Sequence, residues 1–182
     1  MIGKRLESLD LELFVKATNF FAEALGIKDS PTMVSVNIVD NIGTGDVAGV
    51  CIASIKDEEV SSIEIKIKQT ITVFGMIEAL AHEMVHAEQF LNKKLTFEYE
   101  TRYLFGIFPY KRRIKTWKNS YRITGLDYHS EPSEVEAFLK QRILTVQFMK
   151  IVEDELMPSN VFKHIMQDRK DSSTYSALLN IE

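Results

Sequence analysis

The sequence has few of the residues that cross-link a chain or turn it sharply: one cysteine, four prolines and eight glycines among 182 residues. The single Cys51 excludes a disulfide framework within the chain, and its place in VAGVCIASI predicts a small buried side chain. No apolar segment is close to the length of about 20 residues that a membrane-spanning helix needs. Met1 to Asp10 also lack the apolar core of a secretory signal. We therefore expect a protein of the cytoplasm without membrane contact.

A large excess of charge is absent as well. The formal net charge is −4 at pH 7, which argues against a general affinity for nucleic acid or for anionic membranes. Hydrophobic residues make up 45% and charged residues 26% of the chain, as in ordinary globular proteins. A chain of this length suits one domain with its own core. We expect a single domain over 1–182, with a core over about 5–157 and a C-terminal extension over 158–182.

The spacing of apolar residues predicts helices at both ends of this core. Helical spacing from Arg5 to Gly26 predicts an N-terminal amphipathic helix that ends at the glycine. A long final helix is predicted from Pro132 to near Pro158. Its buried register is expected to follow the apolar residues Val135, Leu139, Ile143, Val146 and Ile151.

Between these helices the sequence predicts a small twisted sheet. Alternating residues in TMVSVNIVD, VAGVCIASI and SSIEIKIK predict three short strands, and a fourth is possible elsewhere in the chain. Ser61–Lys68 alternates isoleucine with polar and charged residues, so we expect one face in solvent and a place near the sheet edge. Asn92 to Thr124 shows no clear period and is expected to be irregular. Together these elements predict an α+β fold.

The strongest pattern lies in the stretch ITVFGMIEALAHEMVHAEQFL, from Ile71 to Leu91, which is apolar enough to form a buried helix. It contains the H-E-x-x-H pattern, with histidines at His82 and His86. Residues four apart on a helix lie about one turn over each other, so both imidazoles can be directed at one Zn²⁺. Glu83 lies one position round the helix, where it can accept a proton from a water that the metal activates.

Two sides of this predicted helix differ in polarity. One side is apolar at helical spacing, and another carries the polar residues Glu78, His82, His86 and Gln89. A polar side on a mostly apolar helix predicts that the histidines face a cavity. The alternative is an ordinary amphipathic helix with two surface histidines.

A stable metal site needs a third protein ligand, and three residues near Pro132 are candidates: His129, Glu134 and Glu136. Each carboxylate also has an ordinary explanation, because acidic residues are favourable in the first turn of a helix. Glu136 can in addition form an exposed pair with Lys140, four residues later. The spacing alone leaves these candidates open.

The order of an H-E-x-x-H helix and then an acidic residue on a following helix resembles the gluzincin branch of the zincin metallopeptidases. More narrowly, HEMVHAEQFL, WKNSYR and YHSEPSEVEAF are similar to a group of small phage-encoded or bacterial metallopeptidases, over about residues 70–145. The resemblance implies a zincin-like single domain whose long C-terminal helix carries the third ligand. In such proteins that ligand often stands three residues before a small residue, which favours Glu134, with Ala137, over Glu136. The chain departs from the pattern at Ser133, where relatives often have tryptophan.

The resemblance implies a zinc-dependent peptidase that acts on a peptide or protein. His82, His86 and Glu134 would bind Zn²⁺, and Glu83 would be the general base that activates water and passes its proton to the leaving amine. An extended substrate would lie beside an edge strand, for which Ser61–Lys68 is the expected candidate. Tyr128 or His129 is a candidate for stabilising the oxyanion, against the simpler reading of an ordinary loop residue.

Two other functions fit the same residues. One is a non-catalytic, zinc-stabilised structural or binding module, for instance a phage virion component. The other is a nucleic-acid-associated protease similar to SprT-like proteins, which would use His129 as the third ligand. It is suggested by the segment 102–122, which holds seven basic residues and no acidic one: Arg102, Lys111, Arg112, Arg113, Lys115, Lys118 and Arg122. A solvated loop over the cleft is the simpler interpretation of that segment.

Overall fold

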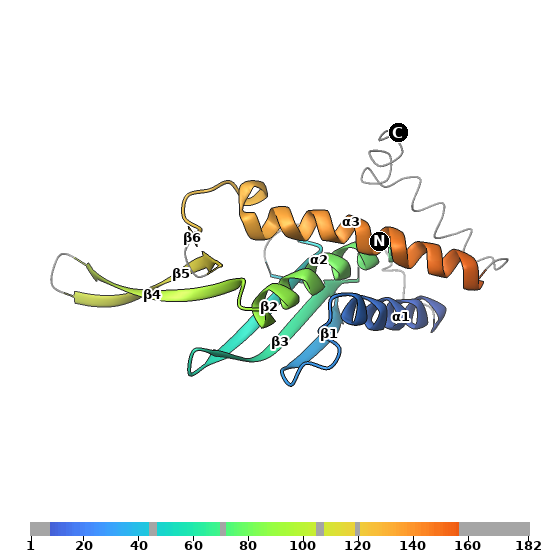
Figure 1. Ribbon diagram of the computed structural model, residues 1–182, viewed down its shortest axis with the longest axis horizontal. Helices are drawn as coiled ribbons and strands as arrows, with labels where there is room; N and C mark the ends of the chain where they lie inside the picture. Colours follow the sequence, from blue (N-terminus) through green and yellow to red (C-terminus); the bar gives the residue numbers. More distant parts are fainter. Residues whose placement is uncertain (1–7, 44–46, 70–71, 105–107, 119–120, 157–182) are drawn as a thin grey trace.

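The structure is a computed structural model that describes residues 8–43, 47–69, 72–104, 108–118 and 121–156. The elements follow one another as α1 (Ser8–Ala24), β1 (Met33–Val39), β2 (Gly49–Lys56), β3 (Glu59–Lys68), α2 (Val73–Leu91), β4 (Leu95–Leu104), β5 (Phe108–Trp117), β6 (Tyr121–Arg122), the short 3-10 helix η1 (Tyr128–Ser130) and α3 (Pro132–Leu156). This mixture of helices and two small sheets confirms the predicted α+β class (Figure 1). The predicted extension over 158–182 lies outside the described residues.

The first sheet has the strand order β1-β3-β2, so β3 lies in its middle. β3 runs parallel to β1 and antiparallel to β2. The expected place of Ser61–Lys68 at the sheet edge is therefore wrong. The alternation of residues did predict correctly that one face of β3 is accessible to solvent. Ile63, Ile65 and Ile67 are buried, while their neighbours are not. A solvent-accessible face does not indicate how many strands lie beside a strand. The edge strands of this sheet are β1 and β2.

Helix α2 lies between this sheet and α3 (Figure 1). Its N-terminus is capped by Thr72, whose hydroxyl accepts a hydrogen bond of 3.1 Å from the Gly75 N–H. Neighbours on both sides explain why every residue from Ala79 to Phe90 is buried, the charged ones included. α1 packs against α2 and α3, and an aromatic cluster of Phe20, Phe21 and Phe148 joins it to α3.

Helix α3 begins at Pro132 as predicted, but its predicted register is wrong. Leu139 is 59% exposed and Ile143 58%, and the other residues of that predicted face are also exposed. The buried apolar residues are instead Ala137, Leu144, Phe148, Met149 and Val152. The inner face also carries polar side chains that contact α2, among them Glu134 and Gln141. The prediction used apolar periodicity alone and therefore took the outer, exposed face of α3 for the buried one.

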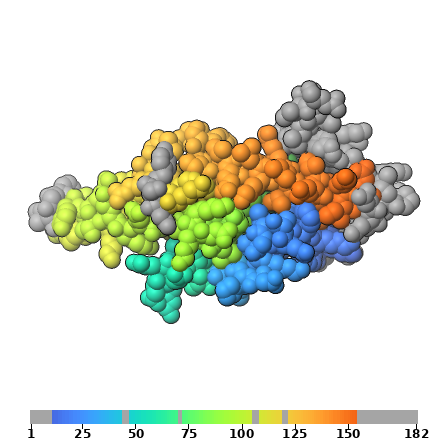
Figure 2. Space-filling view, in the orientation of Figure 1, coloured from blue at the N-terminus to red at the C-terminus, as the bar shows by residue number. Residues whose placement is uncertain are grey.

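The prediction that Asn92 to Thr124 is irregular is also wrong, because this segment contains a long hairpin. β4 and β5 pair antiparallel from Leu95 with Trp117 to Leu104 with Phe108. These two strands (95–104 and 108–117), which we call the arm, project from the body and are narrow in the space-filling view (Figure 2). Most of the arm's outer residues are exposed on both faces, so no burial imposes an alternation on the sequence. Among the described residues, no helix is long and apolar enough to cross a bilayer.

Candidate metal centre

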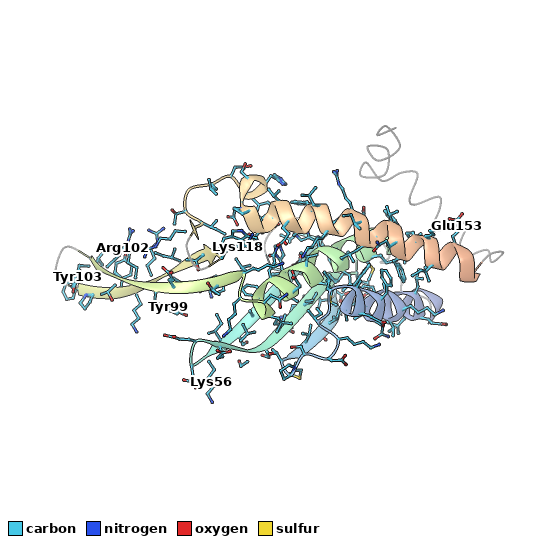
Figure 3. The ribbon with its side chains drawn as sticks, in the orientation of Figure 1. Lys56, Tyr99, Arg102, Tyr103, Lys118 and Glu153 are labelled. Carbon is cyan, nitrogen blue, oxygen red and sulfur yellow. The ribbon has the colours of Figure 1, made fainter. Side chains whose placement is uncertain are left out.

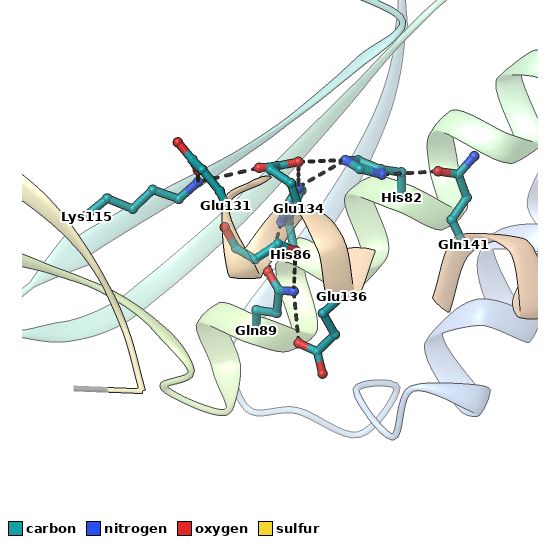
Figure 4. Close-up of polar contacts among 9 residues, drawn as sticks. His82, His86, Gln89, Lys115, Glu131, Glu134, Glu136 and Gln141 are labelled. Atoms are coloured by element: carbon teal, nitrogen blue, oxygen red, sulfur yellow. Dashed lines mark hydrogen bonds and ion pairs between the residues drawn. The ribbon is translucent and has the colours of Figure 1, made fainter. Parts of the chain in front are cut away.

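Three buried side chains from two helices meet at one point between α2 and α3 (Figure 4). His82 Nε2 lies 3.1 Å from His86 Nε2, one turn further along α2. The Glu134 Oε2 atom, in the first turn of α3, lies 3.2 Å from His82 Nε2 and 3.3 Å from His86 Nε2. The three atoms thus form a nearly equilateral triangle. The structure brings together the two histidines and the glutamate that the sequence resemblance favoured.

The hydrogen bonds made by Nδ1 of each histidine indicate which ring nitrogen carries a proton. Gln89 donates its amide N–H groups to the Ser133 carbonyl and to Glu136, so its carbonyl oxygen faces His86 Nδ1 at 2.9 Å. That nitrogen must donate, which leaves a lone pair on Nε2 of neutral His86. His82 Nδ1 lies 3.1 Å from the Gln141 side-chain oxygen, which indicates the same tautomer. Two lone pairs and a carboxylate oxygen then face one another, and this arrangement requires a shared proton or a cation.

The size of the triangle also suits a metal ion. In a tetrahedral site with bonds of about 2.0–2.1 Å, neighbouring ligand atoms lie about 3.3 Å apart. The three observed separations, from 3.1 to 3.3 Å, are close to this value. Two imidazoles and one carboxylate are a ligand set typical of zinc. The residues present therefore fit Zn²⁺ with a fourth position left for another ligand.

The other two candidates for the third ligand lie elsewhere. Glu136 accepts hydrogen bonds from Gln89 at 3.0 Å and Lys94 at 3.2 Å. His129 is exposed, and its ring packs 5.6 Å from that of Phe138. Neither belongs to the group of converging ligand atoms found among the described residues. The fourth histidine of the sequence, His164, lies outside the part of the chain that the structure describes.

The surroundings of Glu134 keep its carboxylate charged. Burial acts to raise its pKa, but hydrogen bonds with His82, His86 and Tyr128 outweigh burial and hold the pKa well below its usual range. The second oxygen, Oε1, lies 3.5 Å from the Lys115 ammonium, which also contacts Glu131 at 2.7 Å. For His86, burial acts to lower the pKa, but Glu134 and Glu83 outweigh it and raise the pKa. The centre therefore favours positive charge.

Glu83 lies beside this centre and faces β2. Burial raises the pKa of its carboxyl group, and the two histidines only partly oppose that shift. The Cys51 backbone N–H donates a hydrogen bond to the carboxylate and fixes its direction. Cys51 itself is half-buried, less than the sequence predicted, and burial together with Glu83 raises the pKa of its thiol. A buried carboxyl with a raised pKa suits a group that accepts and returns a proton.

Gly49 makes room for Glu83 where β2 passes α2. A Cβ atom at position 49 would lie 2.8 Å from Glu83 Cγ and 3.1 Å from Glu83 Oε1. We expect Gly49→Ala to displace the carboxylate and to lower kcat of the proposed hydrolysis by about tenfold or more, since small misplacements of catalytic groups are costly. Metal content should stay unchanged. Steady-state kinetics and zinc analysis of Gly49→Ala beside Ser54→Ala, an exposed change on the same strand, would check this, and equal kcat in both variants would contradict it.

Sequence reasoning missed several residues that support the site. Lys115 and Glu131 approach Glu134 from β5 and from the loop before α3, and no periodic pattern marks either of them. Gln89 was visible as part of the polar side of the α2 sequence, but its link to Ser133 required the fold. Tyr128 was a candidate only because it lies near Glu134 in the sequence.

In comparisons with family models, with curated proteins and with solved structures, nothing matches this chain. The function is therefore inferred from the site itself.

Proposed function

We propose that the protein is a zinc-dependent peptidase of the zincin type, in which His82, His86 and Glu134 bind the metal. The single observation that carries this proposal is the buried triangle of two histidine nitrogens and a carboxylate oxygen, at tetrahedral spacing. Glu83, adjacent in sequence and buried beside it, adds the group that hydrolysis needs. A purely structural zinc site would not need a proton acceptor at this position.

The residues around the centre have separate roles in this proposal. Zn²⁺, when bound, polarises a carbonyl oxygen and makes water more acidic. Glu83 takes a proton from the attacking water and returns it to the amine that leaves. Gln89 and Gln141 hold the ligand imidazoles in the tautomer with a free Nε2. Lys115 contacts Oε1, the Glu134 oxygen that does not face the histidines, and Tyr128 adds a hydrogen bond to the same carboxylate.

Tyr128 is the better of the two candidates for stabilising the oxyanion. Its hydroxyl hydrogen-bonds with Glu134, so it lies at the centre, and about half of its surface is open to solvent. A hydroxyl there can turn to donate to an oxygen that becomes negative during the reaction. The His129 ring packs instead on the rings of Tyr128 and Phe138.

The substrate is proposed to bind along the edge strand β2, in place of Ser61–Lys68, which was expected from the sequence. β2 pairs with β3 on one side, and the order β1-β3-β2 leaves its other side at the sheet edge. It also passes directly beside Glu83, through Gly49 and Cys51. An extended peptide added to this edge would place its backbone next to the general base.

Hydrolysis of an unfolded polypeptide such as casein tests this function. We expect slow cleavage by the zinc-loaded protein, loss of cleavage after treatment with EDTA, and recovery when zinc is added back. Fragments separated by mass spectrometry provide the measurement, and a sample kept in EDTA throughout is the control. Zinc bound at one ion per chain without cleavage of any polypeptide would contradict a peptidase and favour the structural module.

A further inference from the structure

The arm has two faces that differ in charge. In an antiparallel pair, residues opposite each other share a face and alternate along each strand. Tyr99 lies opposite Arg113, Thr101 opposite Lys111 and Phe97 opposite Lys115. We call the face that contains these pairs the acid-free face: Phe97, Tyr99, Thr101, Tyr103, Pro109, Lys111, Arg113 and Lys115. Both carboxylates of the arm, Glu98 and Glu100, lie on the other face.

Side-chain contacts agree with this division. On the other face, Glu98 and Glu100 are paired with Arg122, and Glu100 also with Arg102. On the acid-free face, the Arg113 guanidinium lies over the Phe97 ring, 4.3 Å from its centre. Tyr99 and Arg102 point to opposite sides of the hairpin (Figure 3). Within the described residues, Lys111 and Arg113 have no carboxylate partner, so their charges are available to a ligand.

The acid-free face starts at the candidate metal centre. Lys115, at the base of the arm, reaches Glu134 Oε1 at 3.5 Å, and the next cations on the same face of its strand are Arg113 and Lys111. Tyr99 and Tyr103 flank them on β4, 62% and 61% exposed, and offer rigid apolar contact area. A polypeptide that leaves the centre in this direction would meet alternating aromatic rings and positive charges.

We infer that the acid-free face of the arm is an exosite that binds an extended, acidic stretch of polypeptide next to the bond to be cleaved. This inference rests on the proposed peptidase function and names its substrate class. Cations on alternate residues of β5 repeat about every 6.8 Å, which is also the repeat of same-side residues in an extended peptide. Glutamate or aspartate at every second substrate position would thus match Lys111 and Arg113.

An acidic peptide fits these observations better than a nucleic acid does. Only two unpaired cations stand on the acid-free face, whereas binding to nucleic acid depends on many phosphate contacts. The protein also carries a net charge of −4, which opposes a long polyanion more than a short acidic segment.

Binding without cleavage tests the inference on the full chain with Glu83→Gln. The probe is a short fluorescent peptide with glutamate at every second position, and its control has glutamine in place of glutamate. We expect Lys111→Gln with Arg113→Gln to weaken binding about tenfold, and the glutamine peptide to bind correspondingly weakly. The matched control, Arg102→Gln with Arg112→Gln, removes the same charge from the other face and should change the affinity by no more than about twofold.

The outcomes separate this inference from the proposed function. Equal weakening by both double variants, or no binding of the acidic peptide by the parent chain, would overturn the exosite. Tighter binding of a thymidine oligonucleotide than of the acidic peptide would also overturn it and make the arm a nucleic-acid surface. Because no turnover is measured, a failure here leaves zinc-dependent cleavage of casein untouched, and an inactive enzyme leaves the binding result readable.

Discussion

Glu134→Ala is expected to reduce bound zinc from near one ion per chain to background. The side chain supplies one of three converging ligand atoms, and the two histidines alone leave the ion without a charged partner. Elemental analysis of proteins purified side by side in the same zinc-containing buffer provides the measurement. The loss should be accompanied by loss of any hydrolytic activity.

Glu136→Ala and His129→Ala are the matched controls for this result. Glu136 is nearby on the same helix and is bound to Gln89 and Lys94, while His129 lies in η1 with its ring on Phe138. Both variants should keep the zinc of the wild-type protein. Loss of zinc only in His129→Ala would contradict the assigned third ligand and favour the SprT-like interpretation. Absence of zinc from the wild-type protein, even after zinc is added, would end the metal hypothesis.

Glu83→Gln is expected to keep zinc and to lose hydrolysis by about 10³-fold, within the range that a general base contributes. The amide has the same size and can still accept the hydrogen bond from the Cys51 N–H, so the packing of β2 on α2 should remain. It cannot take a proton from water. Measurement of kcat with a substrate found in the casein digest, together with zinc content, checks the prediction.

His82→Ala is the contrasting variant, because it should lose zinc and activity together. A matched thermal midpoint for Glu83→Gln and wild type would show that the amide leaves the fold intact. Full activity of Glu83→Gln on a validated substrate would contradict the mechanism.

Strong local patterns predicted most of the body of the fold. The three predicted strands and α2 appear within a few residues of their expected bounds, because burial of one strand face and capping by Thr72 act over short distances. The histidine pair followed from helical spacing, and Glu134 followed only from the resemblance to zincins. Its meeting with His82 is a contact across 52 residues, which no local pattern contains.

The errors also have a physical cause. Strand order depends on which neighbours pair, so Ser61–Lys68 looked like an edge although β3 is central. Leu139 and Ile143 mark a regular apolar face on α3, but the face that carries Glu134 and Gln141 is the one that packs on α2. The sequence of the arm shows no alternation of apolar and polar residues, because both faces of the arm are exposed to solvent.

A metal ion bound at the candidate centre would give this chain, with its single cysteine, a removable cross-link. An ion held by His86 and Glu134 would close a loop between positions 48 residues apart, and all of β4, β5 and β6 lie inside that loop. Closing such a loop restricts the unfolded chain much as a disulfide does. Metal supply would then control two properties at once: the chemistry at Glu83, and how firmly the base of the arm is fixed to the body.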